Sequence, residues 1–130
     1  MEKFGVMPPW FLTQATAELP PKVSADVQEA VAVDFVAEPL LAACWTQAVF
    51  GGAAGFVLVT RDRIISKTAM SLRQVRFRDI TAVQRSPVTK DVVAVAPGQK
   101  LDLFNALQMP PAALCDKLFR IIETHWRSQN

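Results

Sequence analysis

The sequence predicts a single α+β domain made of short antiparallel strands and one long helix at the end of the chain. From residue 41 to residue 104, short apolar runs alternate with glycine, proline or charged corners, as in a strand meander. After Pro110 and Pro111, apolar residues recur at the spacing of a helix. A length of 130 residues suits one domain, and a hydrophobic content of 51% allows a core without metal or disulfide staples.

Residues 1–35 are expected to form an arm and a short helix that pack on the body of the domain, which we place at residues 36–130. The arm, residues 1–23, is proline-rich and is predicted to be irregular, with its aromatic side chains docked on the body. Ser24 is a suitable N-cap for a helix over about 25–36, because its hydroxyl can accept a hydrogen bond from the first turn. The chain is therefore expected to begin outside the strand meander.

About seven strands are predicted in the middle of the chain. Over residues 72–78, apolar and polar side chains alternate, which indicates a strand with one face in water. Pro97 and Gly98 form a turn signal that makes a hairpin of the last two strands. The final helix carries Leu114 and Leu118 in an apolar stripe that is expected to lie across an open sheet or to cap a barrel. The predicted strands cover 41–50, 56–60, 64–67, 72–78, 79–83, 92–95 and 100–104.

One segment, residues 39–60, contains no charged side chain and is long enough for a helix to cross a bilayer. The glycine cluster at 51–55 lies between two runs of strand-forming residues, where it favours a turn. We therefore expect two paired strands here, with a membrane-spanning helix as the alternative. A continuous helix over this segment would overturn the strand assignment as a whole.

The reactive residue types do not form a recognisable catalytic set. Cys44 and Cys115 lie in apolar runs and are expected to be free, buried thiols, which fits a reducing compartment and a cytoplasmic location. His125 falls on the apolar side of the final helix, so a packed structural role is predicted. With this one histidine and no C-x-x-C pair, a zinc site is not expected. Neither enzyme activity nor a cofactor or metal is predicted, and the N-terminus lacks the pattern of a secretory signal.

Positive charge is concentrated in the middle of the chain. Residues 61–100 hold nine bases and three acids, whereas residues 1–60 hold two bases and six acids. The overall net charge of +2 is too small to predict nucleic-acid binding. Arg76 and Arg78 share one face of their predicted strand, and Arg73 points to the other. The candidate ligand-binding residues are Arg61, Arg63, Lys67, Arg73, Arg76, Arg78 and Arg85.

Two runs of the sequence resemble the bacterial pleckstrin-homology-like (PH-like) domains. Residues 55–67 consist of an apolar strand after a glycine, a polar corner at Thr60-Arg61-Asp62-Arg63 and a second apolar strand. Residues 75–83 are similar to a strand of that family in which an Asp-Ile pair leads into the next strand. The resemblance covers about residues 36–127. It implies a bent barrel of two near-orthogonal sheets, capped by the C-terminal helix, that serves as a scaffold for interactions.

Two functions follow as hypotheses. The first is a non-catalytic PH-like interaction module that acts through protein–protein contacts or self-association, for example by pairing an exposed strand edge with a partner strand. The alternative is peripheral binding to an anionic membrane or headgroup through the basic face of residues 61–85. The same arginines could also be a solvated face that keeps an edge strand from aggregating. No nucleic-acid or metal partner is expected.

Overall fold

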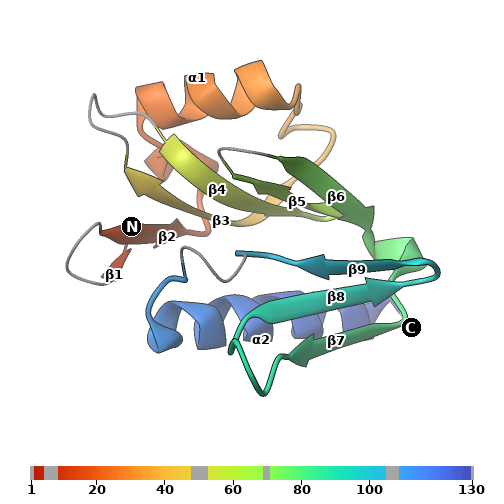
Figure 1. The fold of residues 1–130 in the computed structure, drawn as a ribbon. Coiled ribbons are helices and arrows are strands. Elements are labelled where there is room, and N and C mark those ends of the chain that lie inside the picture. Colours follow the sequence, from red (N-terminus) through yellow and green to blue (C-terminus); the bar gives the residue numbers. More distant parts are fainter. Residues whose placement is uncertain (1, 5–8, 48–52, 69–70, 105–108, 130) are drawn as a thin grey trace.

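The computed structural model describes residues 2–4, 9–47, 53–68, 71–104 and 109–129 (Figure 1). These residues form two antiparallel sheets, two α-helices and two short 3-10 helices. The first sheet is a meander of six strands: β1 (Glu2–Phe4), β2 (Trp10–Thr13), β3 (Leu40–Gln47), β4 (Ala53–Thr60), β5 (Arg63–Lys67) and β6 (Leu72–Arg76). The second sheet has three strands: β7 (Ala82–Arg85), β8 (Val92–Ala96) and β9 (Gln99–Asp102). The helices are η1 (Thr16–Glu18), α1 (Pro21–Ala30), η2 (Phe77–Asp79) and α2 (Ala112–Ser128).

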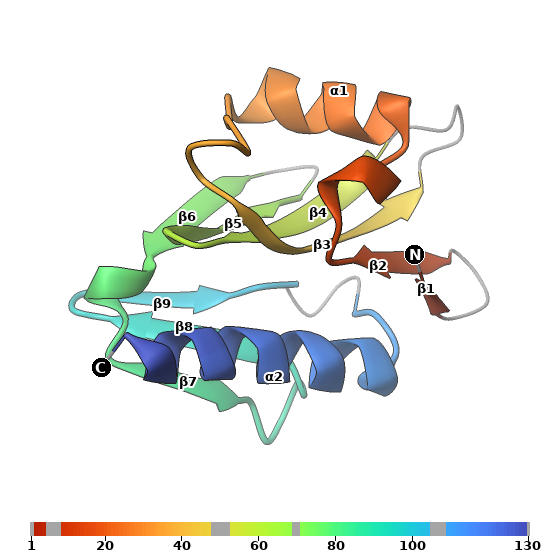
Figure 2. The same cartoon turned by 180° about the vertical axis from the view of Figure 1, so that it is seen from behind.

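The first sheet is covered on both faces. Figure 1 shows α1 lying over its outer face, while the second sheet lies on the opposite side. Figure 2 shows α2 running along the second sheet, where Leu114, Leu118 and Ile122 enter the core between the two sheets. The α+β class and the amphipathic C-terminal helix predicted from the sequence are therefore confirmed.

The uncharged segment forms two paired strands, as predicted. β3 and β4 are antiparallel, with Cys44 opposite Val57 and Trp45 opposite Phe56. Cys44 and Val57 face the core shared with the second sheet, whereas Trp45 and Phe56 face α1. Strands that are buried on both faces become continuous apolar runs, which is why this hairpin resembles a membrane span in sequence. Within the described residues, no helix has the length and apolar character needed to cross a membrane.

The prediction of an irregular arm is wrong, because part of the arm forms a strand. Residues Trp10–Thr13 form β2, which pairs with β3 and places Leu12 opposite Cys44. Trp10 and Leu12 alternate inward and are buried in the main core, with the Trp10 ring edge-on to Phe104 at 5.4 Å between centroids. The nearby prolines suggested an irregular segment, but the strand-forming residues that follow them form a strand between β1 and β3.

The first helix was predicted a few residues too late. It begins at Pro21 instead of after Ser24, because a proline is well suited to the first turn of a helix. It ends at Ala30, short of the predicted residue 36. Beyond its end, the Gln28 amide bonds both the backbone N–H and the carbonyl of Val33, at 2.9 and 2.7 Å. This double hydrogen bond turns the chain back toward β3.

The strands from β3 to β9 number seven, as predicted, with bounds that differ from the predicted ones by up to three residues. The strand predicted over 72–78 ends at Arg76, and the strand predicted over 79–83 begins only at Ala82. Between them the 3-10 helix η2 carries the chain from the first sheet to the second (Figure 1). The Trp126 indole N–H donates to the Ile80 carbonyl at 3.0 Å, which ties this connection to α2.

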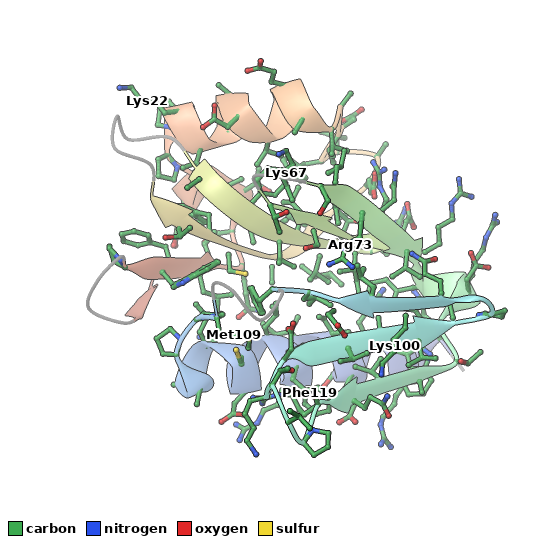
Figure 3. The ribbon with its side chains drawn as sticks, in the orientation of Figure 1. Lys22, Lys67, Arg73, Lys100, Met109 and Phe119 are labelled. Atoms are coloured by element: carbon green, nitrogen blue, oxygen red, sulfur yellow. The ribbon has the colours of Figure 1, made fainter. Side chains whose placement is uncertain are left out.

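The two sheets do not join into the closed barrel that was expected. The described strands of the first sheet end at β6 and those of the second at β9, and side chains span the seam between them. Arg73 Nη2 donates to the Asp102 carbonyl at 2.8 Å, and Gln99 Nε2 donates to the Gln74 carbonyl at 3.0 Å. Figure 3 shows Arg73 at this seam, between β6 and β9. Side-chain hydrogen bonds thus replace the backbone ladder that would close a barrel.

Candidate functional site

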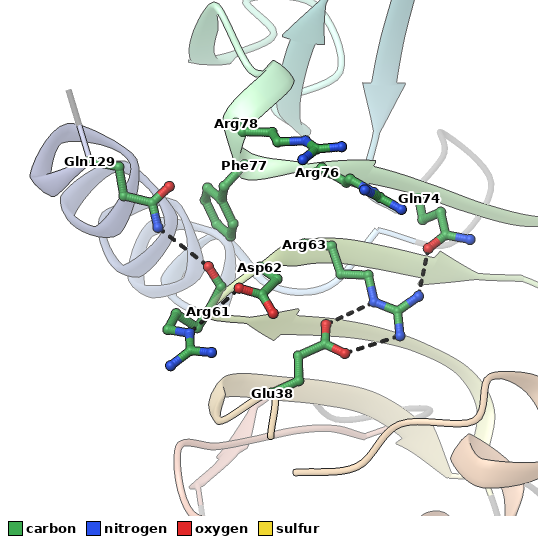
Figure 4. Close-up of a pocket in the computed structure, with 9 residues that line it drawn as sticks. All are labelled: Glu38, Arg61, Asp62, Arg63, Gln74, Arg76, Phe77, Arg78 and Gln129. Atoms are coloured by element: carbon green, nitrogen blue, oxygen red, sulfur yellow. Dashed lines mark hydrogen bonds and ion pairs between the residues drawn. The ribbon is translucent and has the colours of Figure 1, made fainter. Parts of the chain in front are cut away.

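A cleft of about 590 Å³ lies at the polar corner between β4 and β5, beside the end of β6 and the C-terminus of α2 (Figure 4). Four arginines and two carboxylates line it, so positive charges exceed negative charges by two. The lining residues are Glu38, Arg61, Asp62, Arg63, Gln74, Arg76, Phe77, Arg78 and Gln129.

Thr60 fixes the corner that carries three of these residues. Its hydroxyl oxygen accepts hydrogen bonds from the backbone N–H groups of Asp62 and Arg63, at 3.2 and 3.1 Å. The same hydroxyl donates to Glu38 Oε2 at 2.5 Å. Threonine hydroxyls stabilise turns in this way. The corner is therefore held in place by a side chain that is itself fully buried.

The Arg63 guanidinium is already neutralised within the protein. Its Nε and Nη2 donate to the two carboxylate oxygens of Glu38 at 2.8 and 3.1 Å, and its Nη1 donates to Gln74 Oε1 at 2.7 Å (Figure 4). Both side chains of the ion pair are largely buried, at 21% exposed for Arg63 and 15% for Glu38. A two-point contact of this kind is among the stronger polar interactions in proteins. Arg63 thus forms a rigid part of the cleft wall.

The ion pair makes stability depend on pH in the acid range. Burial raises the pKa of Glu38, but hydrogen bonds from Arg63 and Thr60 and the charges of Arg63 and Arg61 outweigh it, so the pKa lies below its ordinary value of 4.5. A carboxyl group whose pKa is lowered by folding stabilises the protein above its unfolded pKa. This stabilisation is lost as the pH falls through the lower pKa of the folded state.

We therefore expect Glu38→Gln to lower the free energy of unfolding at pH 7 by about 1–3 kcal/mol, since it leaves Arg63 without its counter-charge. The difference between the variant and the wild type should shrink as the pH falls below 4.5, because the wild-type carboxyl is then protonated as well. Urea unfolding at several pH values measures this difference. A gap of constant size from pH 7 to pH 3 would contradict the role assigned to Glu38.

Arg76 and Arg78 are the uncompensated charges of the cleft. Both are exposed, and neither forms a hydrogen bond or ion pair within the described part of the chain. Figure 4 shows their side chains extending in the same direction along one wall. Arg76 is also directly opposite Arg63 across β5 and β6, but Glu38 is taken up by Arg63 and leaves Arg76 without a counter-charge. The fold therefore leaves two arginine charges available in the cleft.

The six candidate arginines and Lys67 do not all lie in one place. Arg61, Arg63, Arg76 and Arg78 line the cleft. The other three are engaged elsewhere: Lys67 Nζ donates to the Thr68 carbonyl, Arg73 reaches across the seam to Asp102, and Arg85 pairs with Asp116 and donates to the Lys90 carbonyl. The prediction that Arg73 points away from Arg76 agrees with the burial pattern of β6.

Other lining residues were not singled out by sequence reasoning. Glu38 precedes β3, and Gln129 follows α2, so only the folded chain brings them beside Arg61 and Arg63. The Gln129 amide lies 3.4 Å from the Arg61 carbonyl. Phe77 is buried and forms an apolar wall. No local pattern marks Glu38 or Gln129, because the arginines that they meet in the cleft are 23 or more residues away.

His125 has a structural position, as predicted. Its Nε2 lies 2.7 Å from the Arg61 carbonyl oxygen and 2.8 Å from the Gln129 amide nitrogen. Its ring packs edge-on against Phe77, with 4.7 Å between the ring centroids. His125 thus joins the end of α2 to the polar corner and supports the apolar wall of the cleft.

Both cysteines are free and buried, as predicted. Burial raises the pKa of the Cys44 thiol well above its ordinary range and raises that of Cys115 to about 11. A thiol with a raised pKa is a poor nucleophile at neutral pH. Within the ranges that the structure describes, no group of three or more His, Cys, Asp or Glu side chains is placed to hold a metal ion.

Comparison with protein-family models, with curated proteins and with solved structures found no match to this chain.

Proposed function

We propose that this chain is a non-catalytic interaction module of the PH-like kind, and that it binds an acidic group of a protein partner in the arginine cleft. The single observation that carries the proposal is the pair Arg76 and Arg78. Two exposed guanidinium groups without partners, in a cleft with two excess positive charges, are suited to binding an anion.

The strand order supports the PH-like assignment. Seven strands, β3 to β9, are distributed over two antiparallel sheets and followed by one amphipathic helix, over the residues where the sequence resembles that family. The seam between β6 and β9, which side chains bridge, is the main departure from a barrel. Residues 10–30 add a strand and a helix to this arrangement.

The environment of the reactive groups supports a non-catalytic role. The thiols are buried with raised pKa values, His125 Nε2 is within hydrogen-bond distance of the Arg61 carbonyl and the Gln129 amide, and Glu38 is held by Arg63. A general base needs a free acceptor beside a nucleophile, and these groups do not provide that arrangement. The two free thiols also support a reducing, cytoplasmic location.

The proposal is tested by the binding of an aspartate-rich peptide, measured by fluorescence anisotropy at low salt. We expect the double variant Arg76→Gln/Arg78→Gln to bind about tenfold more weakly or worse, because it loses two charge-assisted contacts. The matched control is Arg120→Gln/Lys100→Gln, which removes the same net charge from exposed residues outside the cleft. Equal weakening by both double variants would show that binding follows net charge alone and would refute the cleft.

An anionic membrane is the second candidate, since exposed arginines can also hold lipid headgroups. Arg61, Arg76 and Arg78 are exposed in the cleft lining and favour it, while the exposed carboxylates of Asp62 and Asp79 oppose it. Sedimentation with vesicles that contain either 30% phosphatidylserine or none distinguishes membrane binding from binding to an acidic protein partner.

Self-association through a strand edge remains a further prediction, and a strict monomer by light scattering at high concentration would contradict it.

A further inference from the structure

The charge balance of the cleft specifies the kind of anion that fits it. Its four arginines and two carboxylates leave an excess of two positive charges, and these are located at one wall, on Arg76 and Arg78. We propose that the cleft binds the phosphate group of a phosphorylated serine or threonine side chain on a protein partner. The inference rests on the proposed function and names the acidic group that this function requires.

The donors available in the cleft match a phosphate. Each guanidinium presents a planar fork of N–H donors that suits phosphate oxygens, and the forks of Arg76 and Arg78 have no partner within the described residues. Gln74 adds a third donor: its Oε1 accepts from Arg63 at 2.7 Å, so its amide nitrogen faces away from Arg63. Arg63 itself keeps N–H groups beyond the three that bond Glu38 and Gln74.

The uncompensated arginine at the sheet edge points to the same ligand. Arg63 and Arg76 are directly opposite each other in β5 and β6, and Glu38 neutralises only Arg63. The charge of Arg76 therefore remains without a counter-charge in the unliganded chain. An anion with two negative charges would neutralise Arg76 and Arg78 together, whereas one carboxylate would leave half of the excess.

The shape of the site favours a side chain over a membrane. The cleft is a recess of about 590 Å³ with the buried ring of Phe77 in one wall, so a small group can enter while a flat surface cannot. Asp62 is exposed in the lining, and Asp79 is exposed one residue beyond Arg78. These carboxylates repel an extended anionic surface but leave room for a compact dianion between the arginines.

The inference is tested by titrating the full chain with three peptides that differ only at the central residue: Gly-Gly-phosphoserine-Gly-Gly, the aspartate version and the serine version. Calorimetry at pH 7.5 should show the phosphoserine peptide binding about tenfold more tightly than the aspartate peptide, with no measurable binding of the serine peptide. Vesicles with a phosphorylated headgroup and inorganic phosphate are titrated in parallel.

The pH profile separates phosphate from carboxylate. Phosphoserine gains its second charge near pH 6, so its affinity should fall about fivefold or more between pH 7.5 and pH 5. The aspartate peptide keeps its single charge over this range. The aspartate peptide lies beside the same protein groups, including Glu38, Asp62 and His125. The pH dependence of its affinity is therefore the reference against which the phosphoserine profile is compared.

The variant Arg76→Gln distinguishes the loss of a binding contact from the loss of the fold. It should weaken phosphoserine binding about tenfold, yet leave the melting temperature within about 2 °C of the wild type, because Arg76 is exposed and forms no contact that holds the fold. The control Arg120→Gln should leave both the affinity for the phosphoserine peptide and the melting temperature unchanged. A variant that merely unfolds would lower the melting temperature instead.

Each outcome has a distinct meaning. If the aspartate peptide binds as tightly as the phosphoserine peptide, the phosphate inference is overturned and the proposed function stands. If neither peptide binds, both are overturned. If only the vesicles bind, the inference is overturned in favour of the membrane candidate.

Discussion

Replacing Leu118 by alanine is expected to lower the free energy of unfolding by about 2–5 kcal/mol. Leu118 is 0% exposed and lies in the core that α2 shares with both sheets. Its removal leaves a cavity that the surrounding strands fill only in part, so the lost contacts add to the lost burial. Urea unfolding followed by circular dichroism measures the change.

The matched control is Arg120→Ala on the same helix. Arg120 is exposed, and alanine is the best helix former, so this variant should stay within about 0.5 kcal/mol of the wild type. A cost below about 1 kcal/mol for Leu118→Ala would show that α2 does not close the core as described.

Removing residues 1–35 is expected to abolish cooperative folding. The deletion takes away β2, which pairs with β3, and α1, which covers the outer face of the first sheet. Trp45, Phe56 and Leu58 would then be exposed on that face. Each such side chain contributes about 1.5–3 kcal/mol when buried, and their sum is comparable to the 5–15 kcal/mol of a whole domain.

The deletion also tests whether residues 36–130 form a domain by themselves. The readout is the thermal transition of the fragment by circular dichroism, beside the full chain and the control Val36→Ala, whose side chain is 91% exposed. A fragment with the same melting temperature as the full chain would show that residues 1–35 are an accessory arm and not part of the folded unit.

The elements that depend on local sequence were predictable. β3 and β4 follow from two apolar runs around glycines, although β4 already begins at Ala53, inside the predicted turn at 51–55, and residues 48–52 lie outside the described part of the chain. α2 follows from a strong apolar stripe after two prolines. β2 was missed because the nearby prolines outweighed a four-residue strand signal, and that strand is stabilised by its non-local pairing with β3. The open seam was not predictable, because it depends on how Arg73 and Gln99 meet distant carbonyl groups.

The candidate site was predictable only in part. The excess of basic residues after residue 60 pointed to Arg61, Arg63, Arg76 and Arg78, which do line one cleft. The sequence does not show which arginines are already paired. That distinction depends on Glu38, which is 25 residues before Arg63 and neutralises it, and it leaves Arg76 and Arg78 as the available charges.

The most direct test of the central claim, that the arginine cleft is the binding site, is an amide NMR titration of the labelled full chain with the phosphoserine peptide. We expect the largest shifts at residues 61–63, 74–79 and 129, which surround the cleft. Shifts centred instead on the shallow groove beside Leu41 and Ile121, or spread over α1, would contradict the account.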